Sequence, residues 1–156
     1  MAAFAGESQA NRKYLAYAKQ AEREGKVNAA RMFRAAAEAE TVHALKELQR
    51  AGKIGTTAEN LADAIAGENY ENTDMYPGFA DAAEADGDAA AARMFRQIAE
   101  VEGIHESLFA DMLEKLETDS GELHFFVCPV CGNVELERPE ACRVCGVPGE
   151  KFTEVG

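Results

Sequence analysis

The sequence predicts a mainly α protein: a four-helix bundle made of two similar helical hairpins, followed by a small module of strands and turns around four cysteines. Three observations support this fold class. Apolar residues recur at helical spacing over residues 3–117. The stretch Glu40-Thr41-Val42-His43 returns as Glu102-Gly103-Ile104-His105, so the helical part is duplicated. All four cysteines lie after residue 127, where Val, Phe, Pro and Gly replace Ala, Glu and Arg.

Length and composition limit the classes of function. The chain has 156 residues, of which 47% are hydrophobic, enough for one domain with an ordinary core plus a small appendage. Its net charge of −12 argues against nucleic acid or an anionic membrane surface as a partner. No apolar run reaches the roughly 18 residues of a membrane span, and we expect no signal peptide. Because the cysteines form two Cys-x-x-Cys pairs, they indicate a metal site in a reducing compartment, and we expect a cytoplasmic location.

The first hairpin is predicted from two amphipathic segments. Residues 3–24 form one helix, which Gly25 ends, and residues 27–51 form the next, which Gly52 ends. The inner face of the first helix is marked by residues at helical spacing: Phe4, Glu7, Ala10, Tyr14, Tyr17 and Ala21.

The second hairpin begins at a predicted helix N-cap, Thr57, with Asn60 at the third helical position. A third helix then runs to about Asp86. Pro77 and Gly78 interrupt it, so we expect a kink there that leaves a backbone carbonyl free one turn earlier.

A fourth helix is predicted for residues 88–117, and the polar residues 118–122 form a linker. The chain therefore divides into a bundle, residues 1–120, and a cysteine module of short strands and turns, residues 123–156. The two duplicated hairpins of the bundle are residues 1–51 and 58–117.

The spacing between the two hairpins changes along the chain. Glu68 follows Glu7 by 61 positions, whereas Arg93 follows Arg31 by 62. One residue was therefore inserted between these two points of the duplication.

Acidic side chains and two histidines share the inner faces of the four helices. In each Glu-x-x-His stretch the two side chains lie on one helix face, so each pair can bind one metal ion. Bundles that bind two irons or two manganese ions use one Glu from each of two helices and Glu-x-x-His from each of the other two. The predicted ligands are Glu7, Glu40, His43, Glu68, Glu71, Glu102 and His105.

The charges of this set favour a pair of metal ions. Its five carboxylates carry −5 and two divalent ions carry +4, so the cluster is nearly balanced when both histidines are neutral. Without metal, each buried carboxylate would cost several kcal/mol. Carboxylate and imidazole ligands together suit iron or manganese better than calcium or magnesium. For either stretch taken alone, the alternative is a solvated charge pair or a hydrogen-bonded core histidine.

Three further residues have roles that the spacing leaves open. Glu71 lies one turn after Glu68, where the first hairpin has Ala10, so it breaks the symmetry of the halves and we expect it to be a ligand. Tyr14 and Tyr76 lie about two turns past the first glutamate of each half. They either pack in the core or donate hydrogen bonds from their hydroxyls to the ligating carboxylates.

The cysteine module has the spacing of one tetrahedral metal site. Ten residues separate Cys128-Pro-Val-Cys131-Gly from Cys142-Arg-Val-Cys145-Gly, and each glycine lets the backbone turn and point amides at the sulfurs. Zinc and iron both fit four thiolates, so a structural zinc ribbon is the alternative to an iron centre. Iron is favoured because the bundle encodes a second redox-capable site. The side chains expected to shield the centre are Phe125, Phe126, Val130, Val144 and Phe152.

Together these residues resemble the rubrerythrin family. The resemblance covers nearly the whole chain: the Phe-Ala-Gly-Glu-Ser-Gln opening, both Glu-x-x-His pairs, the Gly-Glu-x-x-Glu and Met-Tyr-Pro stretches, and a rubredoxin-like tail. It implies a ferritin-like bundle in which the seven ligands named above hold two non-haem irons, with Tyr14 and Tyr76 near them. It also implies one iron on the four cysteines, Cys128, Cys131, Cys142 and Cys145.

The resemblance implies an activity as well. Rubrerythrins usually reduce hydrogen peroxide to water with electrons from a reduced pyridine nucleotide, delivered through rubredoxin or its reductase, and so protect prokaryotes from oxidative stress. In this interpretation Glu71, which has no counterpart in the first half, is the ligand that moves, and Glu71, Tyr14 and Tyr76 form the catalytic set. A ferroxidase or iron-handling protein on the same bundle is one alternative. A structural protein with zinc in both sites is another.

Two features depart from the family. Its members usually have a longer segment before the first glutamate, so we expect a more open entrance to the site. The link between the hairpins, residues 52–57, is also short.

The short link predicts a dimer. The second helix extends about 12 Å beyond His43, and the third begins about 17 Å before Glu68, at 1.5 Å per residue. The link of a ferritin-like bundle would therefore span about 29 Å, whereas its six residues reach only about 20–22 Å. We predict a domain-swapped homodimer, in which residues 1–51 of one chain pack with residues 58–117 of the other. In such a dimer we expect the electron from the cysteine site to cross between chains.

Overall fold

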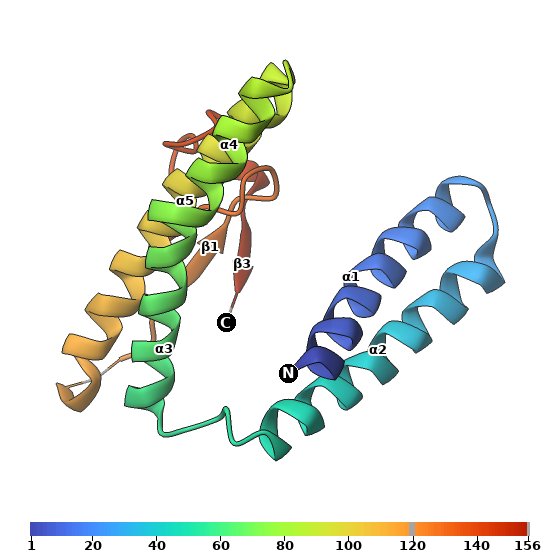
Figure 1. Ribbon diagram of the computed structural model, residues 1–156, viewed down its shortest axis with the longest axis horizontal. Coiled ribbons are helices and arrows are strands. Elements are labelled where there is room, and N and C mark those ends of the chain that lie inside the picture. The colour runs from blue at the N-terminus through green and yellow to red at the C-terminus, as the bar shows by residue number, and fades with distance from the viewer. Residues whose placement is uncertain (119–120, 156) are drawn as a thin grey trace. The chain divides into compact units, whose positions relative to one another are not determined.

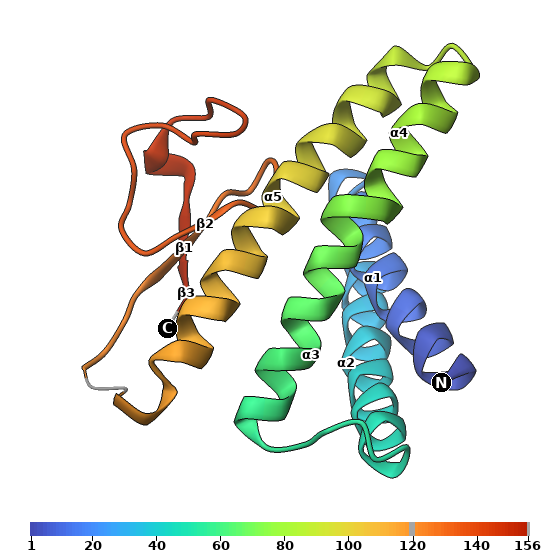
Figure 2. The same cartoon turned by 60° about the vertical axis from the view of Figure 1, so that its left-hand side comes forward.

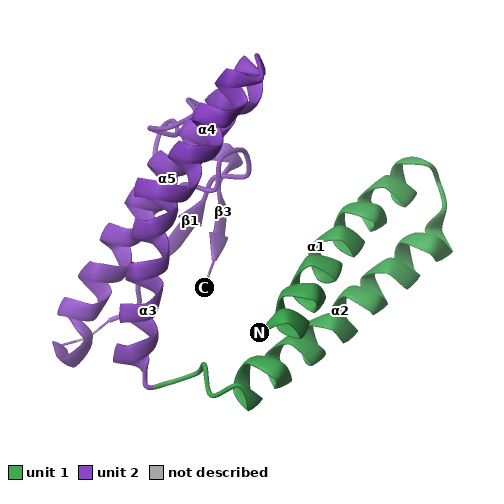
Figure 3. Cartoon of the chain, in the orientation of Figure 1, with its two compact units in different colours: residues 1–55 green, residues 56–156 purple. Residues whose placement is uncertain are grey.

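The computed structural model describes residues 1–118 and 121–155. It consists of two compact units, residues 1–55 and residues 56–156, which Figure 3 colours separately. The cysteine module therefore belongs to the same unit as the second hairpin. The division into a bundle and a separate module stays a prediction. Among the described residues, no helix is both long and apolar enough to cross a membrane.

The first unit is an antiparallel hairpin of two long helices, α1 (Ala2–Arg23) and α2 (Val27–Arg50), as Figure 1 shows. Gly25 makes the turn between them with a φ of 70°, a left-handed conformation that favours glycine. Small side chains at the contact let the two backbones approach closely. The buried ones are Ala18, Ala21, Ala30, Ala37 and Ala44.

In the second unit a run of consecutive helices packs against one long helix. The run comprises α3 (Thr57–Tyr70), the π-helical turn η1 (Glu71–Met75) and α4 (Tyr76–Ala85). The long helix is α5 (Ala89–Glu114), and a short 3-10 turn, η2 (Leu116–Thr118), follows it. Figure 2 shows α3 and α4 following one another alongside α5.

The start of α3 corrects the sequence prediction by one residue. Thr56, not Thr57, is the N-cap: its hydroxyl accepts a hydrogen bond from the Glu59 N–H at 3.3 Å. The Glu59 carboxylate accepts one in return from the Thr56 N–H at 2.8 Å. Both threonines are candidate caps, but only Thr56 has a glutamate at the third helical position, where it completes a capping box.

The break in the third helix also lies earlier than predicted. The irregular segment is η1, in which the N–H of Tyr76 reaches back to the carbonyl of Glu71. Pro77 instead lies in the first turn of α4, a position where its missing N–H is tolerated. The expected kink at Pro77 and Gly78 is therefore wrong in position and in kind.

The last helix is shorter than predicted. Asp88 caps α5 by accepting a hydrogen bond from the Ala91 N–H at 2.9 Å, and the helix ends at Glu114 rather than at residue 117. The predicted linker, residues 118–122, lies partly outside the described residues, because 119 and 120 are not among them.

The cysteine module contains the predicted short strands. They are β1 (Phe125–Val127), β2 (Val134–Glu135) and β3 (Thr153–Val155), joined in an antiparallel sheet of order β2-β1-β3. A 3-10 turn, η3 (Gly149–Lys151), precedes β3. In the central strand, Phe126 pairs with a residue of each neighbour, as the registers Phe126–Glu135 and Phe126–Glu154 show.

Candidate metal centres

The first hairpin brings three of the predicted ligands together. Glu7 of α1 and Glu40 and His43 of α2 place one ligand atom each within 4.8 Å of one another. The Nδ1 atom of His43 lies 2.9 Å from a carboxylate oxygen of Glu40. The hydrogen bond with Glu40 raises the pKa of Glu7, and desolvation and the charge of Glu40 add to the shift. Within its own unit the His43 side chain is 56% exposed.

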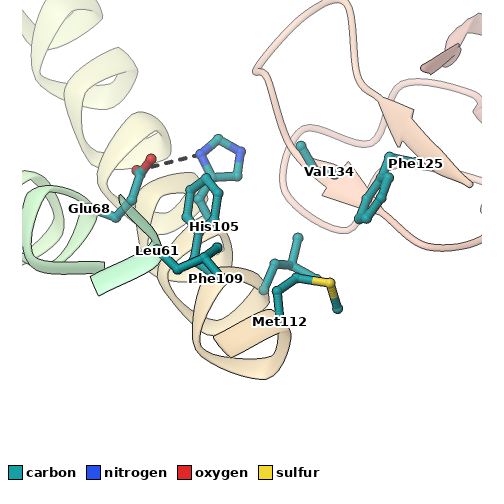
Figure 4. A pocket seen from close by; sticks show the side chains of 8 residues that line it. Leu61, Glu68, His105, Phe109, Met112, Phe125 and Val134 are labelled. Atoms are coloured by element: carbon teal, nitrogen blue, oxygen red, sulfur yellow. Dashed lines mark ion pairs between the residues drawn. The ribbon is translucent and has the colours of Figure 1, made fainter. Parts of the chain in front are cut away.

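The second hairpin forms the corresponding cluster from Glu68 of α3 and Glu102 and His105 of α5. The Nδ1 atom of His105 lies 2.8 Å from a Glu102 oxygen and 3.6 Å from a Glu68 oxygen. Figure 4 shows the Glu68 carboxylate directed at the imidazole ring. This cluster is the better buried one, since the His105 side chain is 22% exposed.

The charges of the second cluster fit a cation. Burial raises the pKa of Glu68, and its hydrogen bond and charge interaction with Glu102 raise it further. Among the described residues, the buried Oε2 atom of Glu68 has no hydrogen-bond partner. Two crowded carboxylates and an imidazole nitrogen are the donors that iron and manganese accept, and a divalent ion would offset the repulsion between the carboxylates.

Glu71 lies beside this cluster rather than within it. It belongs to η1, one turn after Glu68, and is partly buried. Burial raises its pKa, the charge of Glu68 raises it further, and His105 lowers it. The structure therefore brings six of the seven predicted ligands into two triads and leaves Glu71 next to the second triad. That these residues hold metal stays a prediction.

The two predicted tyrosines occupy matching positions. The ring of Tyr14 packs 6.2 Å from that of Phe33, and the ring of Tyr76 packs 6.2 Å from that of Phe95, measured between centroids. Burial raises the pKa of Tyr76, and the charges of nearby glutamates, Glu102 first, raise it further. In the part of the chain that is described, neither hydroxyl makes a hydrogen bond to a predicted metal-ligating carboxylate. Both tyrosines therefore show the alternative of packing in the core.

The four cysteines gather as predicted. The sulfurs of Cys128 and Cys145 lie 3.6 Å apart, as do those of Cys131 and Cys142. Burial alone would raise the pKa of Cys142, but the N–H groups of Cys145 and Val144 stabilise its thiolate and lower the pKa to about 7. Burial raises the pKa of Cys131. Four sulfurs at this spacing form a tetrahedral site for one metal ion.

The shielding of the cysteine cluster is partly as expected. Phe126, Val144 and Phe152 pack against it. Val130 is 66% exposed and does not shield it, because it lies at the tip of the first cysteine loop. Phe125 faces an apolar cavity instead.

That cavity adjoins the second glutamate cluster. It has a volume of about 440 Å³ and lies between α3, α5 and the sheet, with Glu68 and His105 in its wall, as Figure 4 shows. The apolar side chains that line it are Leu61, Leu108, Phe109, Met112, Phe125 and Val134.

Three contacts escaped the sequence analysis. The Nε2 atom of His105 lies 3.2 Å from the carbonyl oxygen of Gly132, the residue after Cys131. Near the same loop, the fully buried Asn133 donates to Glu135 at 2.8 Å, and Arg143 pairs with Glu135 at 3.0 Å. The contacts of His105 with Gly132 and of Arg143 with Glu135 have no periodic signal, because each joins residues from different segments, whereas Asn133 and Glu135 are only two positions apart.

Comparison with known proteins identifies the family. The rubrerythrin family model matches residues 1–49 and 44–113, which is most of the helical part. The chain belongs to the rubrerythrin family. It is 40% identical to a rubrerythrin of Porphyromonas gingivalis, over 96% of this chain and 84% of the relative. It is 32% identical to the nigerythrin of Nitratidesulfovibrio vulgaris, over 97% of this chain and 82% of the relative.

Solved structures agree with this assignment. The structure of nigerythrin in a partially reduced state matches with a TM-score of 0.63 and 30% identity, covering 99% of this chain and 83% of that one. The predicted fold class, a ferritin-like helical protein with a small rubredoxin-like cysteine module, is confirmed. So are the predicted cofactors, iron centres, for which the glutamate–histidine triads and the four-cysteine cluster are the candidate sites. It is accordingly an oxidoreductase with a role in oxidative stress.

Proposed function

We propose that the protein is a peroxidase that reduces hydrogen peroxide to water, with electrons delivered through the cysteine-bound iron from a reduced pyridine nucleotide by way of rubredoxin or its reductase. One observation carries the proposal. The ring of His105 joins the two centres: Nδ1 faces Glu102 and Glu68, and Nε2 faces the backbone of the first cysteine loop.

The two ring contacts of His105 suit a metal ligand. If Nε2 carries the proton and donates it to the Gly132 carbonyl, Nδ1 is left with a lone pair that points toward Glu102. A metal-ligating histidine usually donates its other ring N–H to a carbonyl or carboxylate in this way. When bound, the iron pair supplies the two electrons that peroxide reduction needs, and the cysteine-bound iron restores them one at a time.

The same contact bears on the path of the electron. The cysteine loop lies against His105 of its own chain, within one compact unit. We therefore propose delivery within the chain, in place of the transfer between chains that the sequence suggested. Glu71 and Tyr76 flank this cluster, and we propose Glu71 as the ligand that changes position during turnover.

We also propose the domain-swapped dimer. The link between α2 and α3 covers residues 51–56, and the helix bounds place its ends seven residues after His43 and eleven before Glu68. In a ferritin-like bundle the link between these ends would span about 27 Å, which is longer than the roughly 20–22 Å that six extended residues can reach. A cytoplasmic location is proposed because four free thiols need a reducing compartment.

Replacing Cys142 with Ser tests the activity. The variant should consume one equivalent of peroxide when its glutamate site is reduced beforehand, and then stop, because the second centre no longer restores the electrons. Steady turnover of peroxide should fall at least a hundredfold. Undiminished steady turnover would reject the proposal, and oxidation of added Fe(II) by oxygen without any peroxide activity would favour the ferroxidase.

A further inference from the structure

The two hairpins differ in the spacing between a ligand and an aromatic residue. Tyr14 follows Glu7 by seven positions, whereas Tyr76 follows Glu68 by eight. Seven residues of α-helix return to within about 20° of the starting face, but eight end about 80° away from it. An unbroken α-helix would therefore turn Tyr76 off the face that carries Glu68.

The π turn η1 absorbs the additional residue. It lies between Glu68 and Tyr76, and after it the packing of the first hairpin is repeated. The Tyr17–Phe33 ring centroids are 5.5 Å apart, and those of Phe79 and Phe95 are 5.6 Å apart. The inserted residue of the duplication is therefore located in η1, next to Glu71.

An asparagine lies four positions after the first glutamate of each hairpin. In the first hairpin, Asn11 donates hydrogen bonds from Nδ2 to the Ala37 carbonyl at 2.7 Å and to the Thr41 hydroxyl at 2.9 Å. Thr41 is the residue that follows Glu40 in the Glu-x-x-His stretch. This asparagine therefore fixes α1 against the turn of α2 that carries the histidine pair.

The counterpart in the second hairpin is Asn72, and the residue opposite it is Gly103. A Cβ atom on Gly103 would lie 2.9 Å from the Nδ2 of Asn72, closer than real Cβ contacts allow. Of the described glycines inside helices, Gly103 is the one whose missing Cβ leaves space that another side chain occupies. It makes room for Asn72, the second residue of η1.

We propose that Asn72 and Gly103 are positioning residues for Glu71. Their contact fixes the position of η1 against α5. The carboxylate of Glu71, one residue before Asn72, is thereby held beside the triad Glu68, Glu102 and His105. The first hairpin has alanine at that place, so the contact gives one metal position a carboxylate that the other lacks. The inference rests on the proposed di-iron site and assigns the structural origin of its asymmetry.

Binding of Mn²⁺ to the full chain, freed of metal at the glutamate site and followed by EPR, tests the proposal. Mn²⁺ prefers oxygen and nitrogen ligands over thiolates, so the cysteines do not compete. Gly103→Ala should weaken binding of one of the two ions about tenfold. Asn72→Ala removes the same contact and should weaken that ion by a similar factor, and the double variant Asn72→Ala, Gly103→Ala should bind no more weakly than either single variant, because both changes break one contact.

Two comparisons separate positioning from a general structural effect. Gly67→Ala adds the same methyl beside Glu68, where no atom lies within 4 Å, and should leave Mn²⁺ binding unchanged. In a Glu71→Ala background, Gly103→Ala should have no further effect. Wild-type binding by Gly103→Ala or by Asn72→Ala, losses that multiply in the double variant, or an equal loss without Glu71 would each overturn the proposal. Because no peroxide is used, a failure of the proposed peroxidase activity would leave this result intact.

Discussion

The Nε2 atom of His105 lies 3.2 Å from the carbonyl oxygen of Gly132, and the Nδ1 atom of His43, its counterpart in the first hairpin, lies 2.9 Å from a carboxylate oxygen of Glu40. His105 therefore contacts the cysteine module of its own unit through this carbonyl. His105→Ala should lower the stability of the iron-loaded module by about 1 kcal/mol, the usual contribution of one hydrogen bond. Loss of visible absorption with increasing denaturant measures it.

His43→Ala is the control for this prediction. It removes an equivalent ligand from the other triad and should leave the denaturant midpoint of the module unchanged. Equal shifts in the two variants would mean that metal loss, and not the contact with Gly132, destabilises the module.

The swapped dimer predicts complementation between inactive chains. Glu40→Ala inactivates the first hairpin and Glu102→Ala the second, and each variant alone should show little peroxide turnover. In a mixture with exchanged subunits, half of the dimers are hybrids, and each hybrid has one site built from two intact hairpins. Turnover should therefore recover to about a quarter of the wild-type value.

A mixture of Glu7→Ala and Glu40→Ala provides the control, because both changes lie in the same hairpin and no intact site can form. Recovery in this mixture, or none in the first, contradicts the swap. A monomer mass from light scattering for the iron-loaded protein would contradict it as well.

Two members of each triad could be predicted because their geometry is local, and the third followed from the duplication of the hairpins. Glu40 and His43, or Glu102 and His105, need only a helix to share a face, and the duplication confirmed which face it was. The single four-cysteine site was predicted from the spacing of the two Cys-x-x-Cys pairs.

Other features depended on information that periodicity does not hold. The contact between His105 and Gly132 joins α5 to a loop 27 residues later, and only tertiary packing determines it. The π turn had a signal, the change of spacing between the duplicated halves, but the nearby Pro77 offered a more familiar cause for an irregular helix. The position of the irregular segment follows from keeping the helix in register with its packing partner, and not from the proline.

The module should also depend on Glu135, which connects the two cysteine loops. It accepts a hydrogen bond from the buried Asn133 after the first loop and pairs with Arg143 inside the second. Glu135→Ala would leave the Asn133 amide buried without its partner, at a cost of about 1–3 kcal/mol. The ion pair between Glu135 and Arg143 contributes less to stability, since the Arg143 side chain is 56% exposed. The denaturant midpoint of the iron absorption measures the loss.

Glu154→Ala serves as the comparison, because Glu154 pairs with His124 at the surface of the same sheet. Exposed pairs of this kind contribute about 0–1 kcal/mol, so this variant should remain close to the wild type. A loss as large as that of Glu135→Ala would show that the sheet, and not the connection between loops, responds.

Acid should stabilise the metal-free triads. The pKa of Glu68 is raised in the folded protein by burial and by Glu102, and that of Glu7 by its hydrogen bond with Glu40. A carboxyl group with a raised pKa binds its proton more tightly in the folded state, so it favours folding as pH falls through the folded pKa toward the unfolded value. Metal ions need the carboxylates deprotonated, so Mn²⁺ affinity should rise over the same interval as pH increases.

Other carboxylates titrate in this range too, so the contribution of the triads is isolated with a variant. Glu68→Gln removes the group with the raised pKa while keeping the shape of the side chain. Without metal, the free energy of unfolding of the unmodified protein should increase relative to that of Glu68→Gln as pH is lowered from neutrality toward the ordinary pKa of a glutamate. Parallel pH profiles for the two proteins would mean that Glu68 carries its charge in the folded protein as readily as in the unfolded chain, and the electrostatic case for a resident cation there would be lost.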